Sequence, residues 1–188
     1  ALALAVNGLL PRDGPVKPGV QPGDALVLTR PLGSGVLLAG AMRGLASPVA
    51  IDSLLRQMAQ TNAVAARVLA SFTVHAQTDV TGFGLVGHLA ALLSHSACGA
   101  EINLAAVPSY DGATDLLRLG VRSTLHVHNA QLPASVRLAG GDDALREIVF
   151  DPQTSGGLLA AVPAAEATAC VDALREAGCE AVLIGEVQ

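Results

Sequence analysis

The hydrophobic positions form short strand-like runs and longer helical runs that alternate along most of the chain. Short apolar runs bounded by turn residues predict strands at about 25–29, 73–77, 101–104, 146–150, 157–162 and 181–185. Helical spacing predicts helices at about 35–46, 48–72, 85–94 and 163–177, with a shorter helix that stops at Gly120. Residues 123–129 are predicted to be irregular. This alternation indicates an α/β sandwich, in which helices flank a mixed β-sheet.

The first residues interrupt this pattern. A short apolar stretch is followed by closely spaced prolines, at Pro11, Pro15, Pro18 and Pro22. We interpret residues 1–24 as the end of a preceding amino-terminal domain plus a linker. Residues 25–188 are long enough to form one domain with its own core.

Composition narrows the class of protein. The chain has 188 residues, of which 51% are hydrophobic and 14% charged, as in globular proteins. The apolar runs are too short to span a membrane, and the apolar first residues lack the basic flank of a signal peptide. We therefore expect a cytoplasmic protein without a membrane partner. The net charge of -5, the scattered basic residues and the aromatic content of 2% disfavour a nucleic-acid partner.

The cysteines and histidines do not form the pattern of a metal site. Cys98, Cys170 and Cys179 are odd in number and lack the paired spacings of zinc ligands, so we expect reduced thiols. His126 and His128 could share one face of a strand. A catalytic metal needs about three protein ligands, however, and no third candidate lies near them in the sequence.

A carboxylate, hydroxyls and glycines occur together where a predicted strand becomes a helix. A helix amino-terminus presents unpaired N–H groups to an anion, and glycines let the backbone approach it. The candidate phosphate contacts are Thr78, Thr81, Gly82 and Gly84. Asp79 could hold a hard cation such as Mg²⁺ beside the phosphates. Alternatively Asp79 only caps the helix, and the spacing leaves both interpretations open.

The same stretch contains a match to the G-x-G-x-x-G pattern of dinucleotide-binding folds. Gly82, Gly84 and Gly87 form the match, and Glu101 follows about twenty residues later. These glycines follow a polar segment, whereas the dinucleotide pattern ends a hydrophobic strand within repeated βαβ units. A dinucleotide site is therefore disfavoured.

A second group of special residues lies between two apolar runs near the end of the chain. Its members are Asp151, Gln153, Thr154, Ser155, Gly156 and Gly157. They could contact a ligand, or they could form a turn in which polar side chains satisfy local backbone groups. Spacing alone does not decide between these roles.

Both segments closely resemble signature segments of selenophosphate synthetase, the selenide, water dikinase family. The matching stretches are Thr78 to Gly84 with Gly87-His88-Leu89, and Asp151 to Leu159. The resemblance continues through Pro22-Gly23-Asp24, Leu28 to Gly33, Ser123-Thr124-Leu125 with Asn129, and Ile184-Gly185. Arg30 stands where the family usually has Lys, and Ser34 stands where Thr is common. Both residues keep the type of chemistry.

The resemblance implies a fold and an activity. The family is similar to the aminoimidazole ribonucleotide synthetase superfamily, whose carboxy-terminal domain is an α/β sandwich partly like the ferredoxin fold. Full-length members make selenophosphate, AMP and phosphate from ATP, selenide and water, with Mg²⁺. Their reactive Cys or selenocysteine, lysine and glycine-rich loop lie in the amino-terminal domain, so no catalytic residue is expected in this fragment. One metal-binding aspartate of the family matches Asp79.

The implied partners are the fragment's own amino-terminal domain and a second copy in a full-length homodimer. Alone, the fragment is expected to fold, to be inactive and to bind neither ATP nor Mg²⁺ tightly, because one carboxylate holds Mg²⁺ weakly. One alternative is another ATP-using member of the superfamily, such as a thiamine-monophosphate kinase or a hydrogenase maturation protein. The other is a stand-alone non-catalytic interaction domain. The roles of Asn129 and of residues 151–157 stay open.

Overall fold

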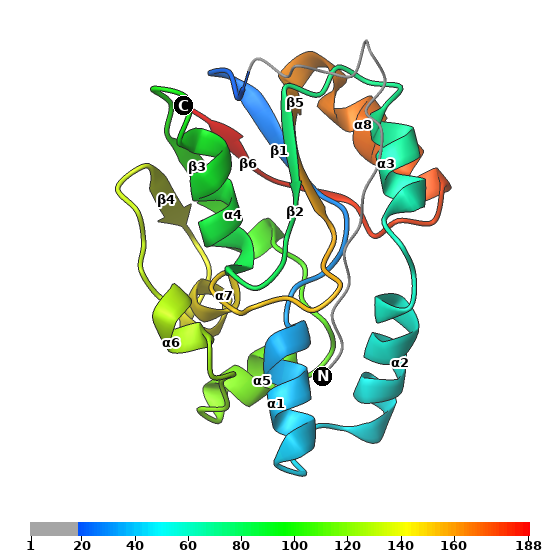
Figure 1. Cartoon of the computed structure of the whole chain (residues 1–188), viewed down its shortest axis with the longest axis vertical. Helices are drawn as coiled ribbons and strands as arrows, with labels where there is room; N and C mark the ends of the chain where they lie inside the picture. The colour runs from blue at the N-terminus through cyan, green and yellow to red at the C-terminus, as the bar shows by residue number, and fades with distance from the viewer. Residues whose placement is uncertain (1–18) are drawn as a thin grey trace, which may run out of the picture.

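The computed structural model describes residues 19–188, which form a six-stranded β-sheet covered by helices (Figure 1). The strands are β1 (Asp24–Leu28), β2 (Ala76–Asp79), β3 (Ala100–Asn103), β4 (Val136–Ala139), β5 (Leu158–Pro163) and β6 (Val182–Val187). The helices are α1 (Ser34–Met42), α2 (Pro48–Met58), α3 (Ala63–Leu69), α4 (Gly84–Leu93), α5 (Ala113–Arg118), α6 (His126–Asn129), α7 (Asp143–Ile148) and α8 (Ala164–Glu176), and a 3-10 turn, η1 (Leu104–Ala106), follows β3. The predicted α/β sandwich is confirmed.

The sheet is mixed, with the strand order β2-β5-β1-β6-β3-β4. Strand β5 pairs antiparallel with β1 and with β2, so that Leu26 lies opposite Ala161 and Thr78 lies opposite Leu159. Strands β3 and β4 form the parallel pair of the described sheet. Because β1 and β5 lie inside the sheet, both of their faces are buried, which explains their nearly continuous apolar runs. Strand β2 lies at an edge.

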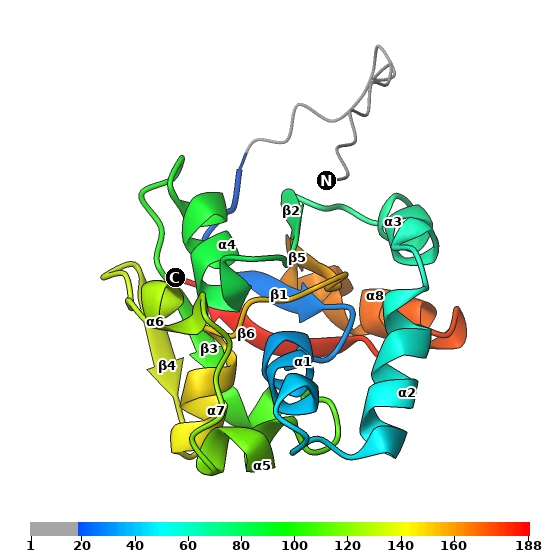
Figure 2. The ribbon, with the colours of Figure 1, turned by 60° about the horizontal axis from the view of Figure 1, so that its bottom comes forward.

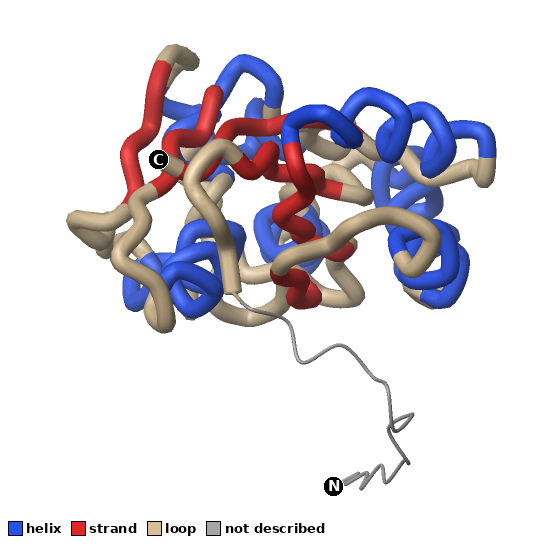
Figure 3. Tube along the Cα trace, turned by 90° about the horizontal axis from the view of Figure 1, so that it is seen from above, coloured by secondary structure: helices blue, strands red, loops and turns tan. Residues whose placement is uncertain are grey.

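Side chains of the central strands alternate between two apolar layers, as the pleat of a strand requires. On one face, Leu26 and Leu28 pack in a cluster with residues of α1, α4, α5 and α7. On the other face, Val27 and Ala160 pack with residues of α3 and α8. Figures 2 and 3 show the helices on both faces of the sheet. The helices that follow β1, β2 and β5, namely α1, α4 and α8, pack against the sheet through these clusters.

The single helix predicted at 48–72 is wrong, because the chain forms two helices there. Helix α2 ends at Met58 and packs on α1, whereas α3 begins at Ala63 and packs on α8. The break contains Thr61 and Asn62, residue types that favour turns because their side chains bond backbone groups. Here the Asn62 amide donates to the Gly156 carbonyl at 2.9 Å. A long-range hydrogen bond therefore fixes the point where the helix breaks.

In the segment 123–150 two predictions are wrong and one strand was not predicted. The strand predicted at 146–150 is wrong, because α7 occupies this stretch and the Asp142 carboxylate caps it by accepting the Leu145 N–H at 2.9 Å. The predicted irregular stretch at 123–129 contains α6, so His126 and His128 lie on a helix and not on a strand. Strand β4 was missed, since four residues at a sheet edge carry little periodic signal.

The expected linker falls largely outside the described residues. Residues 1–18 are not described, and β1 begins at Asp24, close to the predicted start of the domain at residue 25. Within residues 19–188, no helix is long and apolar enough to cross a membrane.

Candidate functional site

The two segments singled out by the sequence meet beside the ends of β2 and β5. We call residues 78–84 the turn segment and residues 151–157 the loop segment. The Val80 N–H donates to the Gly157 carbonyl at 2.9 Å, and the Gln153 N–H donates to the Thr81 carbonyl at 2.9 Å. The structure thus joins the two segments through their backbones.

The loop segment closes the amino-terminus of α1. The residue at the N-cap, Gly33, has no side chain, so the first N–H groups of this helix need acceptors from elsewhere. Gln153 Oε1 accepts the N–H groups of Gly33 and Ser34 at 3.0 and 3.2 Å, and the Ser34 hydroxyl at 3.2 Å. Asp151 Oδ2 accepts the next two N–H groups of the helix at 3.0 and 3.2 Å. The loop segment therefore serves as the cap of α1.

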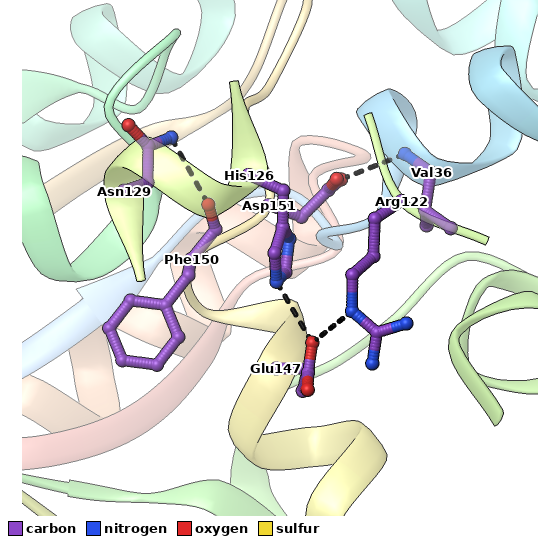
Figure 4. Close-up of polar contacts among 7 residues, drawn as sticks. All are labelled: Val36, Arg122, His126, Asn129, Glu147, Phe150 and Asp151. Carbon is purple, nitrogen blue, oxygen red and sulfur yellow. Dashed lines mark hydrogen bonds and ion pairs between the residues drawn. The ribbon is translucent and has the colours of Figure 1, made fainter. Parts of the chain in front are cut away.

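The carboxyl group of Asp151 is fully buried. Figure 4 shows its hydrogen bond from the Val36 N–H. Its second oxygen, Oδ1, has no hydrogen-bond partner in the described part of the chain. Burial raises the pKa of Asp151 to about 7, against hydrogen bonds from Val36, Gln153 and Gly35 that lower it. Gly35 leaves room for this arrangement, since a Cβ there would lie 2.3 Å from the Pro152 carbonyl oxygen. The Asp151 carboxyl thus lies where a solvent-borne ligand does not reach it.

The far end of the loop segment is tied to β1 and to the α2–α3 connection. Arg30 donates to the carbonyl of Ser155, which has a φ of 51°. Asn62 donates to the Gly156 carbonyl, and a Cβ at Gly156 would lie 2.0 Å from the Val80 carbonyl oxygen. The side chains of Thr154 and Ser155 are exposed. Most special residues of this segment therefore meet requirements of the fold itself.

The turn segment is arranged differently. Asp79 is the last residue of β2 and its side chain is exposed, while Thr78 before it is half-buried. His88 Nε2 accepts the Thr81 N–H at 3.0 Å, which fixes the turn from the first part of α4. Burial lowers the pKa of His88, against the Asp79 carboxylate, which raises it. The neutral ring is the form that can accept this hydrogen bond.

The two glycines of the turn segment differ in what the fold demands of them. Gly84 has a φ of 69°, and a Cβ there would lie 2.9 Å from the Phe150 carbonyl carbon. At Gly82 a Cβ would meet no atom within 4 Å, and φ lies outside the left-handed region. Among the described glycines, Gly82 alone combines these two features. The fold itself therefore does not require glycine at position 82.

The amino-terminus of α4 is partly closed by the chain itself. The Gly84 N–H donates to the Thr81 carbonyl at 3.0 Å, and the Val86 N–H donates to the Val149 carbonyl at 3.1 Å. The expectation of unpaired N–H groups is wrong for these two donors. In the turn segment the Asp79 and Phe83 side chains are exposed, and Gly82 is half-buried.

Asn129 on α6 connects the turn segment to Phe150, the residue just before the loop segment. Its side-chain amide donates to the Gly82 carbonyl at 2.8 Å and to the Phe150 carbonyl at 3.1 Å. Figure 4 shows the second of these hydrogen bonds. The Asn129 side chain therefore holds the turn segment beside the start of the loop segment.

A half-buried polar network, in which only His126 is fully buried, positions α6 on α7. Glu147 Oε2 accepts from Arg122 Nε at 2.6 Å and lies 2.9 Å from His126 Nε2 (Figure 4). The hydrogen bond from Arg122 is the largest cause that lowers the pKa of Glu147, while burial lowers the pKa of His126. Sequence reasoning missed this role of His126 and Glu147, because the two residues lie 21 positions apart on elements whose types were predicted incorrectly.

The described residues do not form a complete metal site. Among residues 19–188, no group of three or more His, Cys, Asp or Glu side chains could hold a metal ion. Cys98, Cys170 and Cys179 form no disulfide with one another in the described structure. Asp79 is one accessible carboxylate, which fits a single position in the shell of Mg²⁺, an ion that keeps waters and binds phosphate oxygens for its other positions.

The fold and the paired segments define an α/β sandwich of the aminoimidazole ribonucleotide synthetase type. A hydrogenase maturation protein, HypE, superposes with a TM-score of 0.65 at 20% identity, covering 95% of this chain and 48% of that chain. Thiamine-monophosphate kinase from Stenotrophomonas maltophilia K279a gives a TM-score of 0.63 at 18% identity, covering 90% and 48%. Residues 21–188 match the family of AIR synthase related proteins, C-terminal domain, and the chain belongs to this family.

Curated relatives agree with the resemblance seen in the sequence. The selenide, water dikinase of Pelobacter propionicus is 40% identical over 188 residues, covering 98% of this chain and 54% of the relative. The selenide, water dikinase of Myxococcus xanthus is 40% identical over 195 residues, with the same two coverages of 98% and 54%. The chain thus spans about half the length of the curated relatives it matches, and the resemblance to this family is confirmed.

Proposed function

We propose that the chain is the carboxy-terminal part of a selenide, water dikinase, which makes selenophosphate, AMP and phosphate from ATP, selenide and water. The observation that carries the proposal is the 40% identity to a protein of that name over 98% of the chain. A HypE protein of the same fold is solved in complex with ATP, which agrees with use of ATP. Because the chain spans 54% of its relative, the remaining catalytic groups are assigned to an amino-terminal part.

Asp79 is proposed as one ligand of the Mg²⁺ that accompanies ATP. Asp79 is exposed at the end of an edge strand, where a ligand can approach it from outside the domain. Bound Mg²⁺ would neutralise charge on the phosphate oxygens, and phosphoryl transfer depends mainly on such positioning and charge stabilisation. In this proposal the chain contributes the negative charge of Asp79, and the pairing of β2 with β5 holds its backbone in place.

Gly82 is proposed to let a phosphate group approach the backbone of the turn segment. The fold does not explain the missing side chain at this position, since a Cβ there would meet no atom within 4 Å. A ligand held close to the backbone would explain it, because glycine is the residue that permits such an approach. Thr78, Thr81 and Gly84 are then near the phosphates through their place in the same turn.

Asn129 and the loop segment are proposed as positioning groups that do not touch the substrate. Asp151 and Gln153 are occupied at the amino-terminus of α1, and Asn129 is occupied by the Gly82 and Phe150 carbonyls. In this interpretation they keep the turn segment at a constant distance from the rest of the domain.

The amino-terminal part and a second copy of the full-length enzyme are the proposed partners. Exposed apolar side chains near the turn segment support such a contact. Phe83 is 71% exposed within the turn segment, and Val127 is 72% exposed on α6, the helix that Asn129 ties to Gly82. A domain that covered this surface would also exclude water from the proposed phosphate site.

A full-length assay tests the proposed function. The full-length protein is incubated without oxygen with Mg-ATP and selenide, and ³¹P NMR follows selenophosphate, AMP and phosphate. We expect AMP and selenophosphate to appear together and only when selenide is present, while the 188-residue chain alone forms neither. Phosphorylation of thiamine monophosphate, or no selenide-dependent AMP, would instead assign the chain to another branch of the superfamily or to a non-catalytic module.

A further inference from the structure

A polar pocket lies outside the proposed ATP site, between the end of β1, the α2–α3 connection and the turn that joins α8 to β6. Its volume is about 300 Å³, and its polar lining includes Arg30, Thr61, Asn62, Cys179 and Glu180. Figure 1 shows α2, α3 and α8 grouped on one side of the molecule, where these segments meet. No residue of the turn segment lines this pocket. The pocket is therefore a separate feature of the domain.

Arg30 brings a buried positive charge to the wall of this pocket. The residue is only 8% exposed, yet within residues 19–188 no carboxylate lies within ion-pair distance of it. Its guanidinium donates to two carbonyls, those of Ser155 and Gln60. Since a guanidinium has five N–H donors, three of them are left without a described acceptor. Buried charges in proteins are normally paired, so this arrangement calls for an anion.

Further donors line the same pocket. The Asn62 amide has two N–H groups, of which one donates to the Gly156 carbonyl, and Thr61 contributes a hydroxyl. A planar guanidinium matches the paired oxygens of phosphate-type anions, which an isolated ammonium does not. The volume suits a small ligand and is at the lower limit for organic cofactors.

We propose that this pocket binds a small oxyanion of the phosphate class, held by the free N–H groups of Arg30 with Asn62 and Thr61. The bound anion would also steady the loop segment. Arg30 and Asn62 already hold the carbonyls of Ser155 and Gly156, so an anion that fixes these two side chains fixes those carbonyls as well. The proposal does not depend on the proposed activity, because neither Asp79 nor Gly82 lines the pocket.

Two other lining residues provide ways to test the proposal. Glu180 is an exposed acid at the rim, where the Gln57 amide donates to its carboxylate at 2.6 Å, and its charge opposes anion binding. The Cys179 thiol is half-buried, and burial raises its pKa. The nearby charge of Arg30 opposes this shift, because it favours the thiolate. An anion in the pocket would shield this thiol and neutralise the charge that favours its thiolate. Both effects slow alkylation of Cys179.

The experiment measures alkylation by iodoacetamide in the 188-residue chain, with phosphate or chloride at constant ionic strength. Peptide mass spectrometry follows Cys179, and Cys98, which does not line the pocket, is the internal control. At phosphate ten times above its dissociation constant, we expect Cys179 to react about tenfold more slowly and Cys98 at an unchanged rate. Equal protection by sulfate would support the class of ligand. Equal protection by chloride, or none by phosphate, would overturn the proposal.

Variants assign the effect to Arg30. Arg30→Met should abolish protection, whereas Arg67→Met, a control at an exposed arginine of α3, should keep it. Because Arg30→Met also removes two hydrogen bonds of the fold, Glu180→Gln provides an independent variant at the rim. It should tighten phosphate binding by about twofold to fivefold, the usual effect of one exposed charge. Unchanged affinity in Glu180→Gln, or full protection in folded Arg30→Met, would contradict the proposed site.

Discussion

The loop segment and the turn segment are similarly rich in polar residues and glycines, but the structure uses them in opposite ways. In the loop segment, Asp151 and Gln153 are buried and accept hydrogen bonds from the first turn of α1. In the turn segment, Asp79 is exposed and the Cβ position of Gly82 faces open space. A dense group of special residues therefore marks a constrained segment. Burial and hydrogen bonding then distinguish a support of the fold from a surface that can meet a ligand.

The largest effect on stability is expected for Gln153→Ala. This change leaves two buried N–H groups and the Ser34 hydroxyl without their shared acceptor, and such losses together cost about 3–4 kcal/mol. Urea denaturation of the 188-residue chain measures the loss. Thr154→Ala is the matched control, because the Thr154 side chain is exposed and only its N–H contacts Ser34. If the two variants were equally stable, the claim that the buried side chains of the loop segment support the fold would be wrong.

The second test separates the two glycines of the turn segment. Gly84→Ala should destabilise the chain by about 2–3 kcal/mol, because of its left-handed backbone and its close approach to Phe150. Gly82→Ala should leave the melting temperature unchanged and reduce selenide-dependent turnover in the full-length protein. Calorimetry and the NMR assay give the two readouts. A Gly82→Ala enzyme with normal turnover would remove the argument that a phosphate approaches this backbone.

The third test concerns the pH dependence that Asp151 confers. Its pKa is raised from 3.8 to about 7 by burial, so the folded state holds the proton more tightly than the unfolded chain does. This contribution favours folding at low pH and is lost as pH rises from about 4 to about 7, with a slope of at most about 1.4 kcal/mol per pH unit. Asp151→Asn should lack this loss, so its stability relative to the parent chain should rise across that range.

Two histidines act in the opposite direction in the same range. Burial lowers the pKa of His88 and of His126, so their contributions favour folding at neutral pH and are lost as the pH falls below 6.5. The difference between the parent chain and Asp151→Asn therefore isolates Asp151. Urea denaturation of both proteins at several pH values measures this difference. Parallel curves of unfolding free energy against pH would show that burial does not raise the pKa of Asp151.

Much of the fold follows from local patterns. The apolar runs of β1 and β5 and the Pro163 and Gly178 boundaries of α8 were predicted, because each depends on residues next to one another in the chain. The break between α2 and α3 depends on Asn62 reaching a residue 94 positions away, which no local pattern encodes. Helix α7 was missed although Asp142 is a typical cap, because the apolar run at its end was interpreted as a strand.

The site was predicted less completely than the fold. The motifs located both segments. Asp79 is not the cap of α4, because it ends β2 and Phe83 occupies the N-cap position, and its metal role stays a proposal. The capping role of Gln153 could not be predicted, because its partners lie 119 and 120 positions away. The same holds for Asn129, whose carbonyl partners at Gly82 and Phe150 lie 47 and 21 positions away. These roles depend on hydrogen bonds between residues far apart in the sequence, which local sequence patterns do not predict.

The most direct test of the account compares two aspartates in the full-length protein. Asp79→Asn should lower the rate of selenide-dependent AMP formation by about 10²–10³-fold with an unchanged melting temperature, because a charge beside the phosphates is lost and the fold is not. Asp151→Asn should keep the rate per folded molecule and change only stability. A near-normal rate in correctly folded Asp79→Asn, or a comparable loss of rate in folded Asp151→Asn, would contradict the assignment of chemistry to the turn segment and support to the loop segment.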